Sequence, residues 1–365
     1  EERGNLRVAH LHSGNIFGGI ERVLITIARH GRGVEHRFGL CHDGRLARQL
    51  ADDTTVSIFP SPRLSRPWTT RRTREAARQT LTGWEPDVFV THSPWDLAVF
   101  GPVIARMKGK KLHWLHAPWR RTVLELISGR WLPPVVIGNS RYTLDASNLS
   151  PDSVTKCLLH NPVEPPVGGD RASLREELAV SPDTVVILQV ARLESWKGQS
   201  QLIAALGRVQ ADTPWECWIV GGEAHGDGYR KTLESSARRL GIGERVRLLG
   251  ERDDLDRIYA SADIFCHPNE EAEPFGVVFV EALYHGLPVI AVDEGGPAEI
   301  IDSSCGRLIA KGDVSSLAHA LEQMIDDPEM RRELSVGAPH RAAVISDPDS
   351  QMTKLEDVLR QTVVR

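Results

Sequence analysis

The amino-acid sequence predicts an α/β protein made of two doubly wound domains. Its 365 residues exceed what one ordinary hydrophobic core organises, and 41% hydrophobic and 25% charged residues are typical of a globular α/β chain. Short apolar segments alternate along the chain with segments of helical patterning. A proline-rich stretch at residues 160–169 interrupts this alternation, so we expect the chain to divide there.

The first half contains six strand-like segments. They are apolar without polar alternation, which is typical of parallel strands buried on both faces. A glycine-containing loop follows the first segment, and a helix should begin at about Gly19. We expect strands at residues 6–12, 36–42, 55–60, 87–92, 110–118 and 134–140.

The second half repeats the alternation, with expected strands at residues 184–192, 217–222, 245–250, 263–268 and 287–296. We therefore place a first domain at residues 1–165 and a second at 170–346. The helical tail at about 347–365 should pack back onto the first domain. If two such domains face one another, their strand ends, and with them the ligand, lie in the cleft between them.

Charge is distributed unevenly between the halves. Residues 1–165 carry 23 Lys and Arg against 15 Asp and Glu (+8), whereas residues 166–365 carry 21 against 34 (−13). The stretch from Arg63 to Arg78 holds six arginines and Trp68. It could contact an anionic acceptor or a lipid headgroup surface, or it could be an ordinary solvated helix.

Cysteine usage and hydropathy bear on the compartment. The five cysteines are scattered and form no CxxC pair, which favours reduced thiols and no metal cage. No apolar run approaches the roughly 18 residues of a membrane helix. We expect a cytoplasmic protein, with peripheral contact at the inner membrane face left open and no nucleic-acid partner.

The segment from Glu273 to Glu281 is the most informative one, because two carboxylates bracket a Pro, a Gly and an apolar helix start. Pro274 suits the first turn of a helix, and Gly276 lets the backbone approach a ligand. A helix start aims unpaired N–H groups at an anion. One carboxylate could then hold a sugar hydroxyl and the other a ribose. The alternative is an amphipathic helix with two solvated glutamates.

Cations and glycines follow other predicted strands. Arg192 and Lys197 come just after a strand and could neutralise a departing diphosphate, or they could be solvated side chains. Gly18 and Gly19 follow the first strand, where the backbone could approach a phosphate or a sugar. Glycines that end later strands, such as those at 295–296, would keep one rim of the domain open.

A histidine ends the strand at residues 110–118. His116 stands where a side chain could reach the ligand and exchange a hydrogen bond with a sugar hydroxyl near the reacting carbon. A lone histidine at a strand end is more often structural. His113 has the opposite phase in the same strand, and we interpret it as a packing residue.

Taken together, these segments resemble the family-4 retaining glycosyltransferases of the GT-B fold, which has two Rossmann-like doubly wound domains facing across a cleft. The similarity spans nearly the whole chain and is strongest from about Val185 to Ile301. The segments that carry it are the Gly18-Gly19 loop with Glu21, HAPWR with His116 and Arg120, IGNS with Asn139 and Ser140, HNPV, the pair of Arg192 and Lys197, LLGER, the bracket of Glu273 and Glu281, HGLPVIA and GGPAEII.

The resemblance implies transfer of a hexose-type sugar from a UDP- or GDP-linked donor to an acceptor hydroxyl with retained configuration. It implies that Glu273 holds the donor sugar, Glu281 the ribose, and Arg192 and Lys197 the diphosphate. Backbone N–H groups at Phe275, Gly276 and Val277 would contact the sugar or phosphate, and the Gly18-Gly19 loop would also face the donor. Residues near Arg252 would line the base. His116 would contact the sugar at the reacting centre, and His116 with Arg120 would meet the acceptor.

The resemblance also implies a front-face displacement in which the leaving phosphate helps to deprotonate the acceptor, without a dedicated base. We expect no metal and no cofactor besides the nucleotide sugar, since the two Asp-x-Asp strings, at 254–256 and 347–349, do not follow buried strands. Pro274 departs from the family, where Gly is frequent at that place. The acceptor would be a glycan, a lipid-linked sugar or a small molecule. A sugar phosphorylase, an epimerase or a non-catalytic nucleotide-sugar-binding protein remains an alternative on the same architecture.

Overall fold

The computed structural model describes residues 5–14, 18–63, 65–150, 154–168, 170–223 and 228–364. The chain forms two compact units. Unit 1 comprises residues 1–164 and 346–365, and unit 2 comprises residues 165–345. The division falls inside the proline-rich stretch, of which Gly169 lies outside the described residues. The last residues of the chain return to unit 1.

Within the described residues, unit 1 is built on a seven-stranded parallel sheet of order β3-β2-β1-β4-β5-β6-β7. Strands β4 and β6 are wholly buried, and β1 and β5 are buried from their third residue onward, as expected for parallel strands covered on both faces. The edge strand β7 was not predicted, because it is short and its side chains are exposed or half-buried. The strands are β1 (Leu6–His12), β2 (Val34–Leu40), β3 (Thr55–Ile58), β4 (Val88–Thr91), β5 (Lys110–Leu115), β6 (Val135–Gly138) and β7 (Thr155–Leu158).

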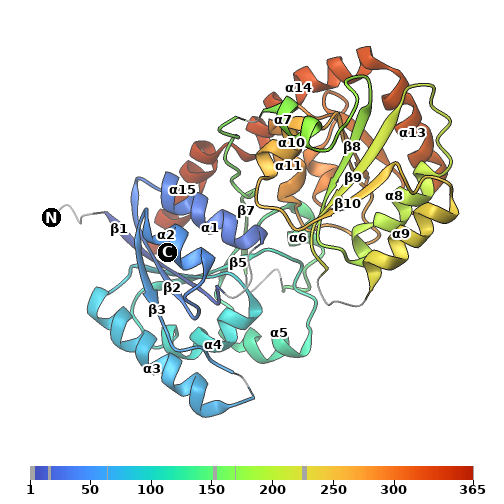
Figure 1. Ribbon diagram of the computed structural model, residues 1–365. Helices are drawn as coiled ribbons and strands as arrows, with labels where there is room; N and C mark the ends of the chain where they lie inside the picture. The colour runs from blue at the N-terminus through green and yellow to red at the C-terminus, as the bar shows by residue number, and fades with distance from the viewer. Residues whose placement is uncertain are drawn as a thin grey trace. The chain divides into compact units, whose positions relative to one another are not determined.

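Helices cover both faces of this sheet (Figure 1). On one face, α1, α2 and α15 bury Leu24, Leu50 and Leu355 in a single core. On the other, α3 and α4 bury Leu81 and Phe100. The helices are α1 (Gly19–His30), α2 (Arg45–Ala51), α3 (Pro67–Trp84), α4 (Pro94–Ile104), α5 (Val123–Ser128), α6 (Arg141–Asp145) and α15 (Pro348–Val364), with a 3-10 turn at Gly129–Trp131.

In the described part of unit 2, six parallel strands form a sheet of order β10-β9-β8-β11-β12-β13. The edge strand β13 was not predicted; it begins with a glycine and an arginine, and its two central residues are only half-buried. The strands are β8 (Val185–Val190), β9 (Trp215–Val220), β10 (Val246–Gly250), β11 (Ile264–His267), β12 (Val289–Val292) and β13 (Gly306–Ile309).

Helices α8, α9 and α13 pack on one face of this second sheet, where Leu202, Leu233 and Leu321 are fully buried (Figure 1). The remaining helices include α7 and α10, which pack together. The helices are α7 (Arg171–Glu177), α8 (Gln199–Leu206), α9 (Tyr229–Arg239), α10 (Leu255–Ser261), α11 (Val277–Tyr284), α12 (Pro297–Ile300), α13 (Val314–Asp326) and α14 (Pro328–Ser346), with a 3-10 turn at Ser195–Lys197.

Candidate functional site

The loop after β8 carries both predicted cations of unit 2. The Arg192 guanidinium lies 3.1 Å from Oε1 of Glu194 and is 59% exposed. Oε2 of Glu194 accepts a hydrogen bond of 2.9 Å from the Trp196 indole. The Lys197 ammonium lies over the Trp196 ring, 3.8 Å from its centroid. The two cations are thus connected through Glu194 and Trp196, and Arg192 keeps most of its charged end in solvent.

Lys197 also meets the first glutamate of the bracket. Its Nζ donates to Oε2 of Glu273 at 2.5 Å, and both side chains are 13% exposed. The buried side chain of Asn269, which the sequence did not single out, donates to the same oxygen at 3.4 Å. The structure therefore brings together Lys197 and Glu273, which are 76 residues apart in the sequence. This contact was not predictable, because it depends on β8 and β11 being neighbours.

The helix after Glu273 begins later than the sequence suggested. Helix α11 starts at Val277, so Pro274 lies before its first turn. Gly276 is the N-cap with a φ of 88°, a conformation that favours glycine. Phe275 is 1% exposed, so its side chain packs inside unit 2. In the first turn of α11 the N–H of Phe279 donates to the carbonyl of Gly276 at 3.0 Å. The N–H groups before it have no preceding helical turn to bond, and such groups suit an anion or a hydroxyl oxygen.

Two glycines press against this loop, contrary to the expectation that they leave the rim open. The N–H of Gly296 donates to the carbonyl of Glu273 at 2.8 Å. A Cβ on Gly295 would lie 2.4 Å from that carbonyl oxygen, and one on Gly296 would lie 2.3 Å from the carbonyl of Phe275. The glycines are therefore required because two backbones meet there, and they fix the position of the Glu273 loop.

Glu281 has a buried partner that sequence analysis missed. The hydroxyl of Tyr259 on α10 donates to Oε2 of Glu281 at 3.0 Å, and Tyr259 is 1% exposed. The ring of His285 stacks on Tyr259 with centroids 5.0 Å apart. Nδ1 of His285 also lies 2.8 Å from the carbonyl of Glu281, one turn back on the chain. These contacts hold the Glu281 carboxylate in one orientation.

Arg252 lies in the loop between β10 and α10 and is held by carboxylates. Its guanidinium donates to both oxygens of Asp254 at 2.7 and 2.6 Å and lies 3.6 Å from Glu177. The hydrogen bonds from Arg252 are the main reason that the pKa of Asp254 is lowered to about 2. This pairing accounts for one acidic string, since Asp254 is the N-cap of α10 and Asp256 lies in its first turn.

In unit 1, the Gly18-Gly19 pair opens α1 and is tied to a buried ion cluster. The N–H of Gly18 donates to Oε2 of Glu21 at 2.8 Å. Oε1 of Glu21 lies 2.8 Å from Nε2 of His12, and Oδ2 of Asp96 lies 3.0 Å from Nδ1 of the same ring. Burial alone would lower the pKa of His12, but Asp96 and then Glu21 outweigh it and raise the value to about 10. Glu21 thus joins the glycine loop to a charged histidine at the end of β1.

His116 directly follows β5 and lies against other aromatic rings. It stacks on Trp114 with centroids 5.6 Å apart, and its Nε2 lies 3.3 Å from Nδ1 of His92. Burial, followed by electrostatic interaction with the His12 and His113 rings, lowers the pKa of His116 to about 3, so the ring is neutral at pH 7. His113 is fully buried and bonds Thr91 at 2.8 Å, in keeping with a packing residue.

Arg120 lies near the start of α5. Its side chain is exposed, while its N–H donates to Oε2 of Glu125 at 3.1 Å. The same oxygen accepts from the N–H of Thr122 at 2.6 Å, so Glu125 organises the turn that presents Arg120.

The basic stretch is only partly available to a partner. Arg74 turns inward and donates to the carbonyls of Ala98 and Val99, and Arg78 pairs with Glu75. Trp68 is 64% exposed. Leu64 lies outside the described residues. The arginines that face solvent therefore lie mainly near the start of α3.

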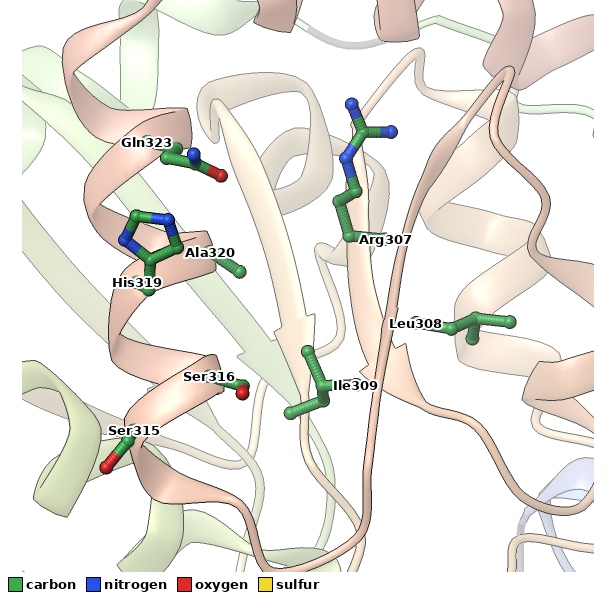
Figure 2. Close-up of a pocket in the computed structure, with 8 residues that line it drawn as sticks. All are labelled: Arg307, Leu308, Ile309, Ser315, Ser316, His319, Ala320 and Gln323. Carbon is green, nitrogen blue, oxygen red and sulfur yellow. The ribbon is translucent and has the colours of Figure 1, made fainter.

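A shallow hollow in unit 2 lies apart from all predicted site residues of that unit. Figure 2 shows it between β13 and α13, with Arg307, His319 and Gln323 among its side chains. None of the predicted site residues lines it. Among the described side chains, no group of three or more His, Cys, Asp or Glu could hold a metal ion. No described helix has the length and apolar character needed to cross a membrane.

Comparison with known proteins agrees with these two units. The family described as Glycosyl transferases group 1 matches residues 170–341, and Glycosyltransferase Family 4 matches residues 17–148. One relative is a GDP-mannose-dependent alpha-(1-6)-phosphatidylinositol monomannoside mannosyltransferase of Mycolicibacterium smegmatis. It is 30% identical over 67% of this chain and 69% of its own length. The chain belongs to the family-4 glycosyltransferases.

Other relatives match over a shorter length. A monoacylated phosphatidylinositol monomannoside mannosyltransferase of Corynebacterium glutamicum is 33% identical over 48% of this chain and 46% of its own. A D-inositol 3-phosphate glycosyltransferase of Corynebacterium aurimucosum is 33% identical over 52% and 47%. The chain therefore spans about half the length of most of the curated relatives that it matches.

Solved structures share the fold. The Anabaena protein HepE, solved with UDP, has a TM-score of 0.84 at 23% identity, covering 98% of this chain and 100% of its own. WaaG, a glycosyltransferase of lipopolysaccharide biosynthesis, has a TM-score of 0.70 at 18% identity, covering 96% and 99%. With the two parallel-sheet units, these similarities confirm the predicted GT-B fold.

Proposed function

We propose that this protein transfers a hexose-type sugar from a UDP- or GDP-linked donor to an acceptor hydroxyl with retention of configuration. The observation that carries the proposal is the contact between Lys197 and Glu273 at the carboxyl ends of β8 and β11, beside the exposed cation Arg192. This arrangement puts cations for a diphosphate next to a carboxylate for sugar hydroxyls. Family membership and the GDP-mannose-dependent relatives support it.

Each site residue has a role in this proposal. Arg192 and Lys197 neutralise the diphosphate as it leaves, and Glu273 holds hydroxyls of the donor sugar. Glu281, oriented by Tyr259, binds the ribose. The backbone at residues 275–277 contacts the sugar or phosphate, and the Arg252 region lines the base. In unit 1, the glycine loop faces the donor, whereas His116 and Arg120 meet the acceptor and the reacting centre.

The reaction is proposed as a front-face displacement. The bond from the anomeric carbon to the phosphate oxygen breaks, the acceptor oxygen bonds to the same face of that carbon, and the acceptor proton passes to the departing phosphate. The leaving group is then the base, and Arg192 and Lys197 supply the positive charge that a metal gives elsewhere. We expect full activity in EDTA.

The donor is tested by calorimetric titration of UDP-, GDP-, ADP- and dTDP-sugars in EDTA. Tight binding of one donor, followed by turnover with an acceptor, would establish the class and exclude a sensor role. Activity that vanishes in EDTA and returns with magnesium would refute the metal-free mechanism. Turnover to a sugar phosphate with inorganic phosphate would favour the phosphorylase alternative.

Glu273 tests the assignment of the sugar contact. Replacing Glu273 with Ala should lower transfer by orders of magnitude and leave nucleotide affinity nearly intact, because the contact matters most in the transition state. The nucleoside diphosphate alone is the control ligand, since it lacks the sugar. An equal loss of nucleotide affinity would contradict this role.

A phosphate-bearing, lipid-linked acceptor is the second part of the proposal. Relatives are named for phosphatidylinositol monomannoside and D-inositol 3-phosphate. On α5, Val123, Leu126 and Ile127 share one face and are 75%, 63% and 48% exposed, next to the exposed Arg120. An apolar face beside a cation suits the surface of an anionic membrane.

Vesicle sedimentation tests the membrane contact. We expect the protein to sediment with vesicles of anionic phospholipid and not with neutral ones, and Leu126→Ser should weaken this binding severalfold. Val336 on α14, in unit 2, is 78% exposed, and Val336→Ser is the matched control. Equal binding to both vesicle types would contradict the proposal.

A further inference from the structure

Four histidines form a hydrogen-bonded chain across unit 1. Nδ1 of His36 lies 2.9 Å from Nε2 of His10, Nδ1 of His10 lies 3.0 Å from Nε2 of His92, and Nδ1 of His92 lies 3.3 Å from Nε2 of His116. In every link a δ nitrogen meets an ε nitrogen. The four rings come from or directly follow β2, β1, β4 and β5, which are adjacent in the sheet.

The strand register explains why the rings meet. Val8 lies opposite both His36 and Val88, and His10 lies opposite Val90, so residues of even number in β1, β2 and β4 share one face. Val90 lies opposite Leu112 on β5, which extends this face toward Trp114 and His116. It is the face that α1 and α15 cover. His113 is an odd-numbered residue of β5, so its side chain lies on the other face of the sheet.

All four rings are neutral at pH 7. Burial and the neighbouring rings hold the pKa of His10 and His92 well below the ordinary value. Burial lowers the pKa of His36 to about 4, and burial with His12 and His113 lowers that of His116 to about 3. A neutral imidazole has one N–H donor and one acceptor nitrogen. Each hydrogen bond between two rings therefore uses a proton from only one of the two rings.

This restriction couples the four tautomers. If His36 donates through Nδ1, each following ring accepts through Nε2 and donates through Nδ1, and the last proton lies on Nδ1 of His116. If His116 donates through Nε2, all four rings carry the proton on Nε2. Both arrangements satisfy every link, and a mixed set leaves a buried link with two protons or none, which costs about 1–3 kcal/mol.

The free end of the chain is on His116. Its Nδ1 is buried and has no hydrogen-bond partner in the described part of the protein. The opposite end, His36, lies at a hollow lined by residues of α15 such as Glu356. Whether Nδ1 of His116 can donate to or accept from a hydroxyl is thus coupled to the tautomers of His92, His10 and His36.

We propose that His36, His10 and His92 are positioning residues that fix the tautomer and orientation of His116. The proposal deepens the proposed function, because it rests on His116 contacting a sugar hydroxyl. The four rings then share one tautomer, so His116 offers its hydrogen bond at the reacting centre in concert with the three rings behind it.

The tautomers can be read directly by NMR of the full chain labelled with ¹⁵N-histidine, since protonated and bare ring nitrogens have distinct shifts. We expect His10, His36, His92 and His116 to show one shared tautomer at pH 7. The proposal would be overturned if the four histidines had different tautomers, if any of them were a mixture of tautomers, or if one of the rings were protonated. This readout needs no substrate and no substitution.

The variant His10→Phe breaks the chain two rings from His116 and keeps an aromatic ring stacked on Phe38. We expect His116 to become a mixture of tautomers and the turnover number to fall on the order of tenfold, with nearly unchanged nucleotide affinity. His113→Phe, an equally buried ring on the opposite face, is the matched control and should leave the His116 tautomer unchanged. An unchanged His116 tautomer in His10→Phe would refute the coupling of the four histidine tautomers. If the tautomer changes but no donor is ever turned over, the proposed function fails and the coupling of the histidines stands.

Discussion

The buried His12 should make the stability of unit 1 depend on pH in a specific direction. Both ring nitrogens of His12 lie within 3.0 Å of a carboxylate oxygen, of Asp96 and of Glu21. Ionised carboxylates only accept hydrogen bonds, so both nitrogens must donate and the ring must be an imidazolium. His12 and Glu21 are each 4% exposed and Asp96 is fully buried, so solvent screens these contacts little.

The magnitude follows from the raised pKa. The pKa of His12 is about 10 in the folded protein against 6.5 in the unfolded chain. The contribution is fully present below pH 6.5 and is lost as the pH rises toward 10, because the unfolded chain releases its proton first. When the pH is raised from about 7 to about 8.5, the loss of this contribution from His12 should lower the free energy of unfolding by about 2 kcal/mol.

The assay is urea unfolding of the full chain at both pH values, followed by pulse proteolysis with peptides of unit 1 identified by mass spectrometry. The control is His12→Gln, which cannot carry the charge. Burial, followed by the charge of Asp96, raises the pKa of the Cys41 thiol to about 12, and this thiol is present in both proteins. The parent should lose about 2 kcal/mol more than the variant over this range. Equal pH dependence of the two proteins would show that His12 is neutral and refute the reasoning.

Two further predictions concern unit 2. Tyr259→Phe removes the hydrogen bond to Glu281 and should weaken nucleotide binding about threefold to tenfold in calorimetry, with a loss of about 1 kcal/mol in the stability of unit 2. Unchanged affinity would show that Tyr259 does not orient Glu281 for the ribose. Gly198→Ala places a Cβ 1.8 Å from the carbonyl oxygen of Pro268 at a φ of 75°, and should destabilise unit 2 by at least about 3 kcal/mol. Gly241→Ala has a similar φ of 74° and open space around it, so it should cost only about 1 kcal/mol, and equal losses would contradict the steric argument.

The sequence by itself determined the class of fold and most strands, because strands buried on both faces leave continuous apolar runs that need no partner to be recognised. It missed β7 and β13, which are short edge strands. It also singled out Lys197, Glu273, Glu281 and His116 as candidate site residues, since unusual residues at strand ends and helix starts can be recognised in the sequence.

Only the tertiary structure decided what those residues touch. The pairing of Lys197 with Glu273, the support of Glu281 by Tyr259, and the rings behind His116 each join distant segments through sheet order and register. Histidines that end or follow β1, β4 and β5 were a visible signal. Their contacts were not, because they depend on the pairing of β1 with β4 and on the strand register, which exist only in the folded sheet. The type of each side chain can be read from the sequence. The hydrogen bonds that set the protonation and orientation of these side chains form only when the strands lie side by side in the folded sheet.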